Sequence, residues 1–379
     1  MLLRRKLCVA LVIATILFLM LASQSIQRRH FLPLSLAPPN SHATPTGGGT
    51  VVKATAPPAV RTNKLTPPPI AIKPEVKEEG DKEDKEEEPI ENSQYDQRPC
   101  SCPDSCVSDL DRSVWFSKRY DSKQQPILQE ANNNFDQAAL TWWLALQRSG
   151  NDQTLEKVMS ELFRVISPPT GDFKPLPSKC RSCAVVGNSG NLRDSGNGDL
   201  IDSHGSVIRM NKAVTRGFEK DVGNRTTYHF LYPESAVDVA PGVSLVLLPF
   251  KLRDLEWLTS ALSTGHIKTT YMRVKDRVQA DKDKVLVVNP EFFKYVHDRW
   301  TEHHGRYPST GMLAIIFALH TCDKVSVFGY GADQLGNWHH YWEQNRHAGA
   351  FRKTGVHSAD FETQVIHQLA KEGKISLHL

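Results

Sequence analysis

Histidine side chains near the C-terminus are the first candidates for chemistry in this sequence. Residues 338–343 read Trp-His-His-Tyr-Trp-Glu, and His357 stands five residues before Glu362. A histidine can act as a general base near neutral pH because the pKa of its imidazole lies close to that pH. The alternative for any one of the fifteen histidines is a structural role. A catalytic role therefore requires that other segments of the chain build a site around residues 338–343 and His357.

Metal ligation is a second chemistry that these residues could serve. His339 and His340 are adjacent, so on a regular backbone their side chains point apart, and no third ligand is evident. An Asp-x-Asp pair of the kind that holds Mn²⁺ occurs at 109–111 and at 281–283, but neither pair follows a hydrophobic strand. The sequence therefore predicts no metal site.

Two further segments could hold an anion. Residues 183–192 read as a buried strand, a small polar turn with Gly187 and Gly190, and then a helix, which suits a nucleotide phosphate. The spacing matches neither Gly-x-Gly-x-x-Gly nor a P-loop. In residues 306–311, Ser309 is a good N-cap, and the amides of Thr310 and Gly311 would offer a second anion site. A simple helix cap is the alternative there.

Strands alternating with helices must position these segments. Short β-rich runs occupy residues 184–187, 206–210, 227–231, 244–250, 284–288 and 324–328. Helical periodicity occupies residues 141–147, 155–165, 254–262, 290–300 and 310–320. This alternation predicts an α/β domain with a mostly parallel, doubly wound sheet, in which ligands bind at the carboxyl ends of the strands.

The N-terminal part is organised differently. Arg4, Arg5 and Lys6 precede an apolar run over residues 7–22, which predicts a cytoplasmic tail at 1–6 and a transmembrane signal anchor at 7–26. A cleaved signal peptide is the alternative. Residues 27–98 are rich in proline, glycine and acidic residues and predict an extended stem, with an acidic binding tail as the rival interpretation. Residues 99–379 form the predicted lumenal domain.

Cysteines and charge agree with a lumenal domain. Beyond Cys8 there are six cysteines, which predict three disulfides in an oxidising compartment, although spacing leaves fifteen pairings open. Zinc at Cys180-x-x-Cys183 is the alternative, without a second ligand pair at zinc-finger distance. Asn224-Arg225-Thr226 is a glycosylation sequon. The net charge of +4, with no basic stripe carrying aromatic residues, argues against a nucleic-acid partner.

Together, the four chemistry-bearing segments resemble the sialylmotifs of the animal sialyltransferases. Residues 183–235 resemble the long motif and residues 306–331 the short motif. Residues 340–343 resemble the third motif, and His357 with Glu362 the very short His-x-x-x-x-Glu motif. The motifs occur in the family's order and are most similar to those of β-galactoside α2,3-sialyltransferases that act on galactosyl-β1,3-N-acetylgalactosamine. The stem is longer than is usual in that group.

The resemblance implies an inverting enzyme with a modified GT-A fold that requires neither a metal nor another cofactor. His357 would be the general base, and His340 with Tyr307 would hold the departing phosphate. The residues implied for binding the donor, CMP-sialic acid, are Asn188, Asn211, Tyr271, Tyr307, Ser309, Gly311, Gly331, Trp338 and His340. Those implied for the acceptor are Gln147, Tyr232, Ser235, Tyr271 and Tyr307. The implied disulfides are Cys100–Cys106, Cys102–Cys180 and Cys183–Cys322, the first less directly because three residues separate Cys102 from Cys106.

The implied reaction is transfer of sialic acid to the 3-hydroxyl of a terminal galactose on glycoproteins or glycolipids. The implied location is the Golgi membrane, with a single-pass type II orientation and a soluble form if the stem is cleaved. The nearest alternative is a sialyltransferase of another linkage or acceptor. An inactive, membrane-tethered glycan-binding relative is the alternative outside the enzymes, although His357 and the motif asparagines are all retained.

Overall fold

A seven-stranded sheet forms the centre of the domain. The structure is a computed structural model that describes residues 100–103, 106–147, 153–168, 178–332, 338–344 and 355–379. The strands are β1 (Ser182–Val186), β2 (Ser206–Met210), β3 (Tyr228–Leu231), β4 (Ser244–Leu247), β5 (Val285–Val287), β6 (Lys324–Phe328) and β7 (Ser376–His378). Their order is β5-β4-β3-β2-β1-β6-β7, and all six neighbouring pairs are parallel. The predicted parallel α/β sheet is therefore confirmed.

The inner strands are apolar because both faces of the sheet are covered. Residues 183–186 of β1 and 325–328 of β6 are all buried, and such strands read as continuous apolar runs rather than as alternating ones. The six predicted strands correspond to β1–β6, with shorter bounds at β4 and β5. β7 was not predicted from the sequence.

The strand order creates a crevice beside β1. The chain runs outward from β1 to β5, then returns to place β6 on the other side of β1. Connections therefore leave β1 and β6 in opposite directions at their carboxyl ends, which is where ligands bind in open α/β sheets. The two ends remain joined beyond the strands, because the Gly187 N–H donates to the Phe328 carbonyl oxygen at 2.7 Å.

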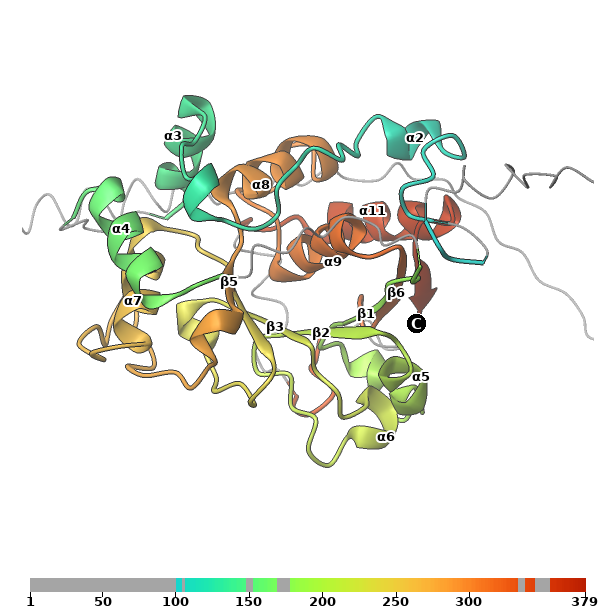
Figure 1. The fold of residues 1–379 in the computed structure, drawn as a ribbon. Coiled ribbons are helices and arrows are strands. Elements are labelled where there is room, and N and C mark those ends of the chain that lie inside the picture. Colours follow the sequence, from blue (N-terminus) through green and yellow to red (C-terminus); the bar gives the residue numbers. More distant parts are fainter. Residues whose placement is uncertain (1–99, 104–105, 148–152, 169–177, 333–337, 345–354) are drawn as a thin grey trace, which may run out of the picture. The chain divides into compact units, whose positions relative to one another are not determined.

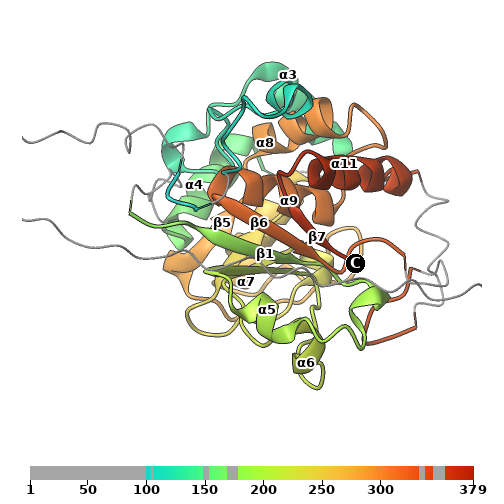
Figure 2. The ribbon, with the colours of Figure 1, turned by 90° about the vertical axis from the view of Figure 1, so that its right-hand side faces the viewer.

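Helices cover both faces of the sheet. They are α2 (Val114–Ser117), α3 (Gln137–Leu146), α4 (Leu155–Val165), α5 (Gly198–Asp202), α6 (Glu219–Val222), α7 (Leu252–Ala261), α8 (Pro290–Tyr295), α9 (Thr310–Thr321) and α11 (Ala359–Lys371). Figure 1 and the turned view in Figure 2 place α8, α9 and α11 on one side of the sheet and the short α5 and α6 on the other. The predicted helix over residues 290–300 is α-helical in its first half and π-helical over Val296–Trp300.

Helix α9 is the central helix of its layer. Nine of its twelve residues are buried, so it is apolar on almost every side, as a helix enclosed by other elements must be. It packs against β1, β2, β3 and β6. Its N-terminus is capped by Ser309, whose hydroxyl oxygen accepts from the Met312 N–H at 3.1 Å. The predicted N-cap at Ser309 is confirmed. Because α9 is buried, the position of Ser309 is fixed relative to the sheet.

One local prediction was wrong. The segment after β1 was expected to open a helix whose amides face a phosphate, but the chain forms a three-residue 3-10 helix, Gly190–Leu192, before the five-residue α5. Asp194 and Gly196 follow with positive φ values of 62° and 66°, so the backbone cannot continue the helix there. Of the two predicted anion sites, only the one at residues 306–311 lies at the N-terminus of a long helix, the twelve-residue α9.

Three disulfides join the chain: Cys100–Cys106, Cys102–Cys180 and Cys183–Cys322. These are the pairs that the sialylmotif resemblance implied. Cys183 lies in β1 and Cys322 is the C-cap of α9, so the third bond fastens the central strand to the central helix. All six thiols are thereby used, which leaves none of them for a zinc site.

The predicted tail, signal anchor and stem (residues 1–98) lie outside the described residues. Within the described ranges, no helix is both long enough and apolar enough to cross a membrane.

Candidate active site

A cavity of about 290 Å³ opens at the carboxyl ends of β1 and β6. Its walls come from the turns after these two strands, the N-terminus of α9, the start of α11 and the segment 338–340. Seven of the residues implied by the motifs line it: Asn188, Ser309, Gly311, Gly331, Trp338, His340 and His357. Residues more than 160 positions apart in the sequence therefore meet in one cavity.

Two glycines allow the floor of the cavity to form. A Cβ atom on Gly187 would lie 2.3 Å from the Gly329 carbonyl oxygen, so only glycine permits this backbone approach. Gly329 has φ +69°, and a Cβ there would also lie 2.3 Å from Leu192 Cδ1. The turns after β1 and β6 consequently touch through their backbones, which fixes Asn188 on one side relative to Gly331 on the other.

Asn188 brings a buried hydrogen-bond acceptor to the cavity. Its Nδ2 donates to the Met210 carbonyl oxygen at 3.1 Å, which fixes the orientation of the amide. Its Oδ1 is buried and accepts no hydrogen bond from the described residues. A buried polar atom without a partner costs free energy, and a ligand N–H or O–H would remove that cost.

The N-terminus of α9 is held by Glu362 from α11. The Glu362 carboxyl group accepts from the Ser309 N–H at 2.8 Å and from the Ser309 hydroxyl at 2.5 Å. Burial raises the pKa of Glu362 to about 7, against the opposing effect of the two Ser309 hydrogen bonds. The first amides of α9, at Thr310 and Gly311, have no acceptor within the helix, so this end presents a partial positive charge to the cavity.

His357 has the geometry and pKa of a general base. Its Nδ1 lies 2.9 Å from the Tyr307 carbonyl oxygen, which can only accept, so Nδ1 carries the proton and Nε2 is the basic nitrogen of the neutral ring. Burial lowers the pKa of His357, with the Tyr307 hydrogen bond opposing it, so the imidazole is uncharged at neutral pH. An antiparallel bridge between Gly305 and His357 fixes the backbone.

His340 lines the same cavity and contacts a carboxylate and an aromatic ring. Its Nδ1 is 3.0 Å from Glu343 Oε1, and its ring stacks on Trp342 with centroids 4.5 Å apart. The ring of His340 is therefore held between a carboxylate and an indole at the wall of the cavity. In the part of the chain that the structure describes, no group of three or more His, Cys, Asp or Glu side chains could hold a metal ion.

The residues implied for the acceptor form a second cluster beside the cavity. Gln147 Nε2 donates to the Tyr307 hydroxyl at 2.9 Å. Phe250 links the aromatic rings, with its centroid 4.9 Å from that of Tyr307 and 6.0 Å from that of Tyr232. Tyr271 is 62% exposed and joins the cluster through Lys251. Tyr307 adjoins the cavity as well, because its ring centroid lies 5.1 Å from that of His357.

Asn211 and Ser235 lie behind Tyr232, whose N–H donates to the Ser235 hydroxyl oxygen at 3.2 Å. Asn211 follows β2 with φ 59°, and its Oδ1 accepts from the Ser235 hydroxyl at 3.0 Å. Neither side chain lines the cavity, although Asn188 binds the backbone of Met210 directly before Asn211. The structure thus pairs a residue implied for the donor with one implied for the acceptor.

Sequence reasoning did not identify Lys251, Asp254 or Glu234 as part of the site. Lys251 contacts both carboxyl groups and lies beneath Gln147 and Tyr271. Glu234 lies in the long motif but was given no role there, Lys251 and Asp254 lie in none of the motifs, and charged residues at the start of a helix usually face solvent. Only the three-dimensional arrangement brings them together.

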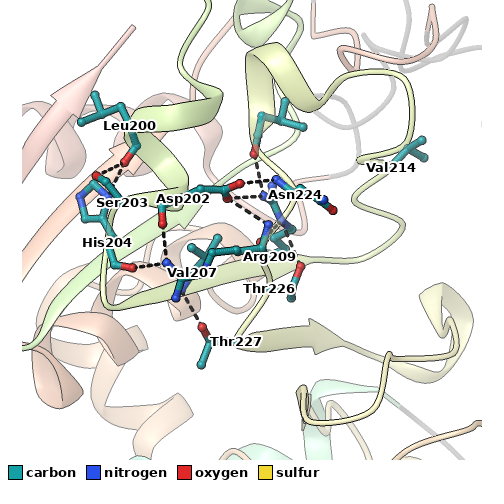
Figure 3. A network of polar contacts seen from close by, with 12 residues as sticks. Leu200, Asp202, Ser203, His204, Val207, Arg209, Val214, Asn224, Thr226 and Thr227 are labelled. Atoms are coloured by element: carbon teal, nitrogen blue, oxygen red, sulfur yellow. Dashed lines mark hydrogen bonds and ion pairs between the residues drawn. The ribbon is translucent and has the colours of Figure 1, made fainter.

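The sequon residue Asn224 does not line the cavity and belongs to the polar network of Figure 3. Its side chain is exposed, while its N–H donates to Asp202 Oδ2 at 2.7 Å. The hydroxyl of the sequon threonine, Thr226, accepts from Nε of the buried Arg209 at 3.2 Å. Arg209 Nη2 also donates to the Val222 carbonyl oxygen at 2.6 Å.

Comparison with known proteins places the chain in a family. Residues 127–374 match the family described as glycosyltransferase family 29 (sialyltransferase). The chain is 53% identical over 281 residues to the CMP-N-acetylneuraminate-beta-galactosamide-alpha-2,3-sialyltransferase 2 of Mus musculus, covering 74% of this chain and 80% of that protein. It is 50% identical over 287 residues to the corresponding sialyltransferase 1 of Sus scrofa, covering 75% and 82%.

Solved structures agree with these relatives. A crystal structure of a mammalian sialyltransferase matches with a TM-score of 0.68 and 48% identity, covering 74% of this chain and 99% of that one. A mammalian sialyltransferase in complex with Gal-beta-1-3GalNAc-ortho-nitrophenol matches with a TM-score of 0.67 and 47% identity, with the same coverage. The resemblance drawn from the four motifs is confirmed, and this chain belongs to glycosyltransferase family 29, the sialyltransferases.

Proposed function

We propose that this chain transfers sialic acid from CMP-sialic acid to the 3-hydroxyl of a terminal galactose, with galactosyl-β1,3-N-acetylgalactosamine on glycoproteins or glycolipids as the acceptor. The names of the Mus musculus and Sus scrofa relatives support the α2,3 linkage and the β-galactosamide acceptor. The ligand of the similar crystal structure supports the disaccharide. The observation that carries the proposal is the meeting of His357, Asn188, Ser309 and His340 in one cavity.

The proposed reaction is a single displacement with inversion. His357 Nε2 takes the proton from the galactose 3-hydroxyl, and the oxygen forms a bond to the anomeric carbon of sialic acid. The bond from that carbon to the phosphate oxygen breaks, its electron pair stays on the phosphate, and CMP leaves. The departing group is a nucleoside monophosphate, released from a single phosphodiester, so less charge develops on it than on a departing diphosphate. His340, the Tyr307 hydroxyl and the α9 amides suffice to stabilise it without a metal ion.

The remaining residues are proposed to orient the two substrates. Asn188 and Gly331, on the turns after β1 and β6, would line the CMP site with Trp338, Ser309 and Gly311. Tyr271 and Tyr307 would reach both substrates, while Gln147 and Tyr232 would face the galactoside. Asn211 and Ser235, which hydrogen-bond to each other, would support these groups from outside the cavity. Orientation of this kind supplies much of the rate enhancement in a two-substrate transfer.

Transfer by the full-length protein in detergent tests the proposal. With CMP-sialic acid and galactosyl-β1,3-N-acetylgalactosamine we expect CMP release and an α2,3-linked product, identified by linkage analysis. A 3-deoxygalactoside control should give no product because it lacks the reacting hydroxyl. EDTA should leave the rate unchanged, and strong loss on chelation would contradict metal independence. A product of another linkage would favour the alternative sialyltransferase, and galactoside binding without CMP release would favour an inactive relative.

We also propose that residues 7–26 anchor the chain in the Golgi membrane, with residues 1–6 cytoplasmic, residues 27–98 as the stem and the domain in the lumen. The sequon supports this orientation, because Asn224 is exposed and N-glycosylation occurs on the lumenal side. The Thr226 hydroxyl is bound by Arg209 once β2 and β3 have folded, so glycosylation should precede folding of this region. The wild type should lose mass on enzymatic removal of N-glycans, and the Asn224→Gln variant should not. Equal behaviour of the two would contradict lumenal glycosylation at this site.

A further inference from the structure

A buried ammonium group lies beneath the acceptor-side cluster. The Lys251 side chain is 2% exposed, and its Nζ is 2.6 Å from Asp254 Oδ1 and 3.2 Å from Glu234 Oε1. Burying a charge is costly unless it is paired, and these two carboxyl groups, themselves buried, supply the pairing. Asp254 is fixed in turn by the Phe250 N–H at 2.8 Å, and Glu234 by the Thr270 hydroxyl. The ammonium group therefore has a fixed position.

This ammonium group determines the orientation of the Gln147 amide. Lys251 Nζ donates to Gln147 Oε1 at 3.1 Å. A lysine ammonium has no lone pair, so the carbonyl oxygen of the amide must face it, and the NH₂ group must face the other way. That NH₂ group donates to the Tyr307 hydroxyl at 2.9 Å. The direction of the second hydrogen bond is thus a consequence of the first.

The orientation of Gln147 in turn sets the role of the Tyr307 hydroxyl. Because its oxygen accepts from Gln147, its own proton must point in another direction. Among the described residues, Gln147 is the one hydrogen-bond partner of that hydroxyl. Tyr307 also contacts the base, through its carbonyl oxygen on His357 Nδ1 at 2.9 Å and through the two rings. A flipped Gln147 amide would instead accept the hydroxyl proton and withdraw it from the reacting groups.

We propose that Lys251 is a positioning residue for sialyl transfer: it holds the Gln147 amide so that Tyr307 directs its hydroxyl proton to the substrates. The inference rests on the proposed function, and Lys251 itself touches neither substrate. The same ammonium lies 4.8 Å from the centroid of the Tyr271 ring, a cation–π contact that holds a second residue of the acceptor-side cluster. Loss of Lys251 should therefore affect the acceptor more than the donor.

A double-mutant cycle between Lys251→Met and Tyr307→Phe tests this chain of contacts. It is measured on the full-length protein with CMP-sialic acid and galactosyl-β1,3-N-acetylgalactosamine, as kcat and as KM for each substrate. Lys251→Met should lower kcat/KM for the acceptor about 10- to 100-fold, the range for a lost hydrogen bond to a charged group, with little change in KM for the donor. In the Tyr307→Phe background the same substitution should cost less than about 3-fold, because the hydroxyl that it positions is gone and only the Tyr271 contact remains to be lost.

A second variant keeps the test independent of folding. Gln147→Glu preserves the partner of Lys251 but replaces the NH₂ group with an acceptor, so the Tyr307 hydroxyl must donate to it. We expect a loss similar to that of Lys251→Met, again suppressed by Tyr307→Phe. The matched control is Lys275→Met, which removes a 2.7 Å ion pair to Asp238 at an exposed position and should leave transfer unchanged.

The outcomes separate the inference from the proposed function. If the unmodified protein forms no sialoside, the proposed function fails and the inference fails with it. If the unmodified protein transfers sialic acid but the losses from Lys251→Met and Tyr307→Phe multiply independently, the inference alone is overturned. It is also overturned if Gln147→Glu retains full activity, or if the loss from Lys251→Met falls equally on the KM of the donor.

Discussion

Replacing His357 with alanine should lower kcat for sialyl transfer about 10²- to 10⁴-fold, the usual contribution of general acid–base catalysis. The basic nitrogen Nε2 is lost, and no other described imidazole is held by the Tyr307 carbonyl oxygen. Binding of CMP, measured by calorimetry, should change little because Asn188, Ser309 and His340 remain. Loss of CMP affinity with intact turnover at saturating donor would contradict the role of base.

The pH profile and a conservative variant sharpen this prediction. Burial lowers the pKa of His357, so kcat/KM should fall on the acid side with an apparent pKa below 6.5, as the imidazole becomes protonated and cannot accept the proton. His357→Asn keeps a donor for the Tyr307 carbonyl oxygen but has no basic nitrogen. It should be as inactive as the alanine variant, and recovery of activity would assign His357 a positioning role instead. His266→Ala, at an exposed position hydrogen-bonded to Thr264, is the control.

Removal of the Cys183–Cys322 disulfide is expected to have the largest effect on stability. The bond closes a loop with a sequence separation of 139, so in the chain-entropy model it stabilises the fold by about 5 kcal/mol. The Cys183→Ala/Cys322→Ala double variant should lose that much free energy of unfolding, measured by urea denaturation without reductant. Activity should fall as well, because the bond joins β1, which leads to Asn188, to α9, which begins after Ser309.

The short disulfide of the same domain provides the comparison. Cys100–Cys106 has a sequence separation of 6, for which the same model gives about 2 kcal/mol. The Cys100→Ala/Cys106→Ala variant should therefore lose less than half as much stability and retain transfer, since no residue of the cavity lies in that loop. Equal losses for the two double variants would show that loop closure does not determine the contribution of the long bond.

The parallel sheet could be predicted because its strands are buried on both faces. Residues 183–186 and 325–328 are unbroken buried runs with few polar residues, which is an unambiguous signal once they alternate with helices. Strand β7 gives no such signal, since Ser376–His378 is three residues long and none of them is fully buried. Helix α11 was not predicted, although Phe361, Val365, Ile366 and Leu369 have the spacing of an apolar helix face.

The site was predictable only where motifs carried it. The resemblance pointed to His357 and Ser309, but nothing local predicts that Glu362 would hold Ser309 across 53 positions. Lys251 shows the limit more clearly. Its burial depends on Glu234, which reaches it from a different segment, so neither periodicity nor propensity could indicate it. The partnership of Asn211 with Ser235 is likewise a property of the folded chain.

The place of Tyr307 between two groups of side chains has a consequence for how such enzymes diversify. Its hydroxyl belongs to the cluster with Gln147, and its backbone belongs to the cavity with His357. If the proposed roles hold, side-chain changes at Gln147 or Tyr232 should alter which sugar is accepted and leave nucleotide binding unchanged. A set of enzymes that share one sugar donor but use different acceptors is therefore expected to differ at the side chains around the Tyr307 hydroxyl and to agree at those around His357.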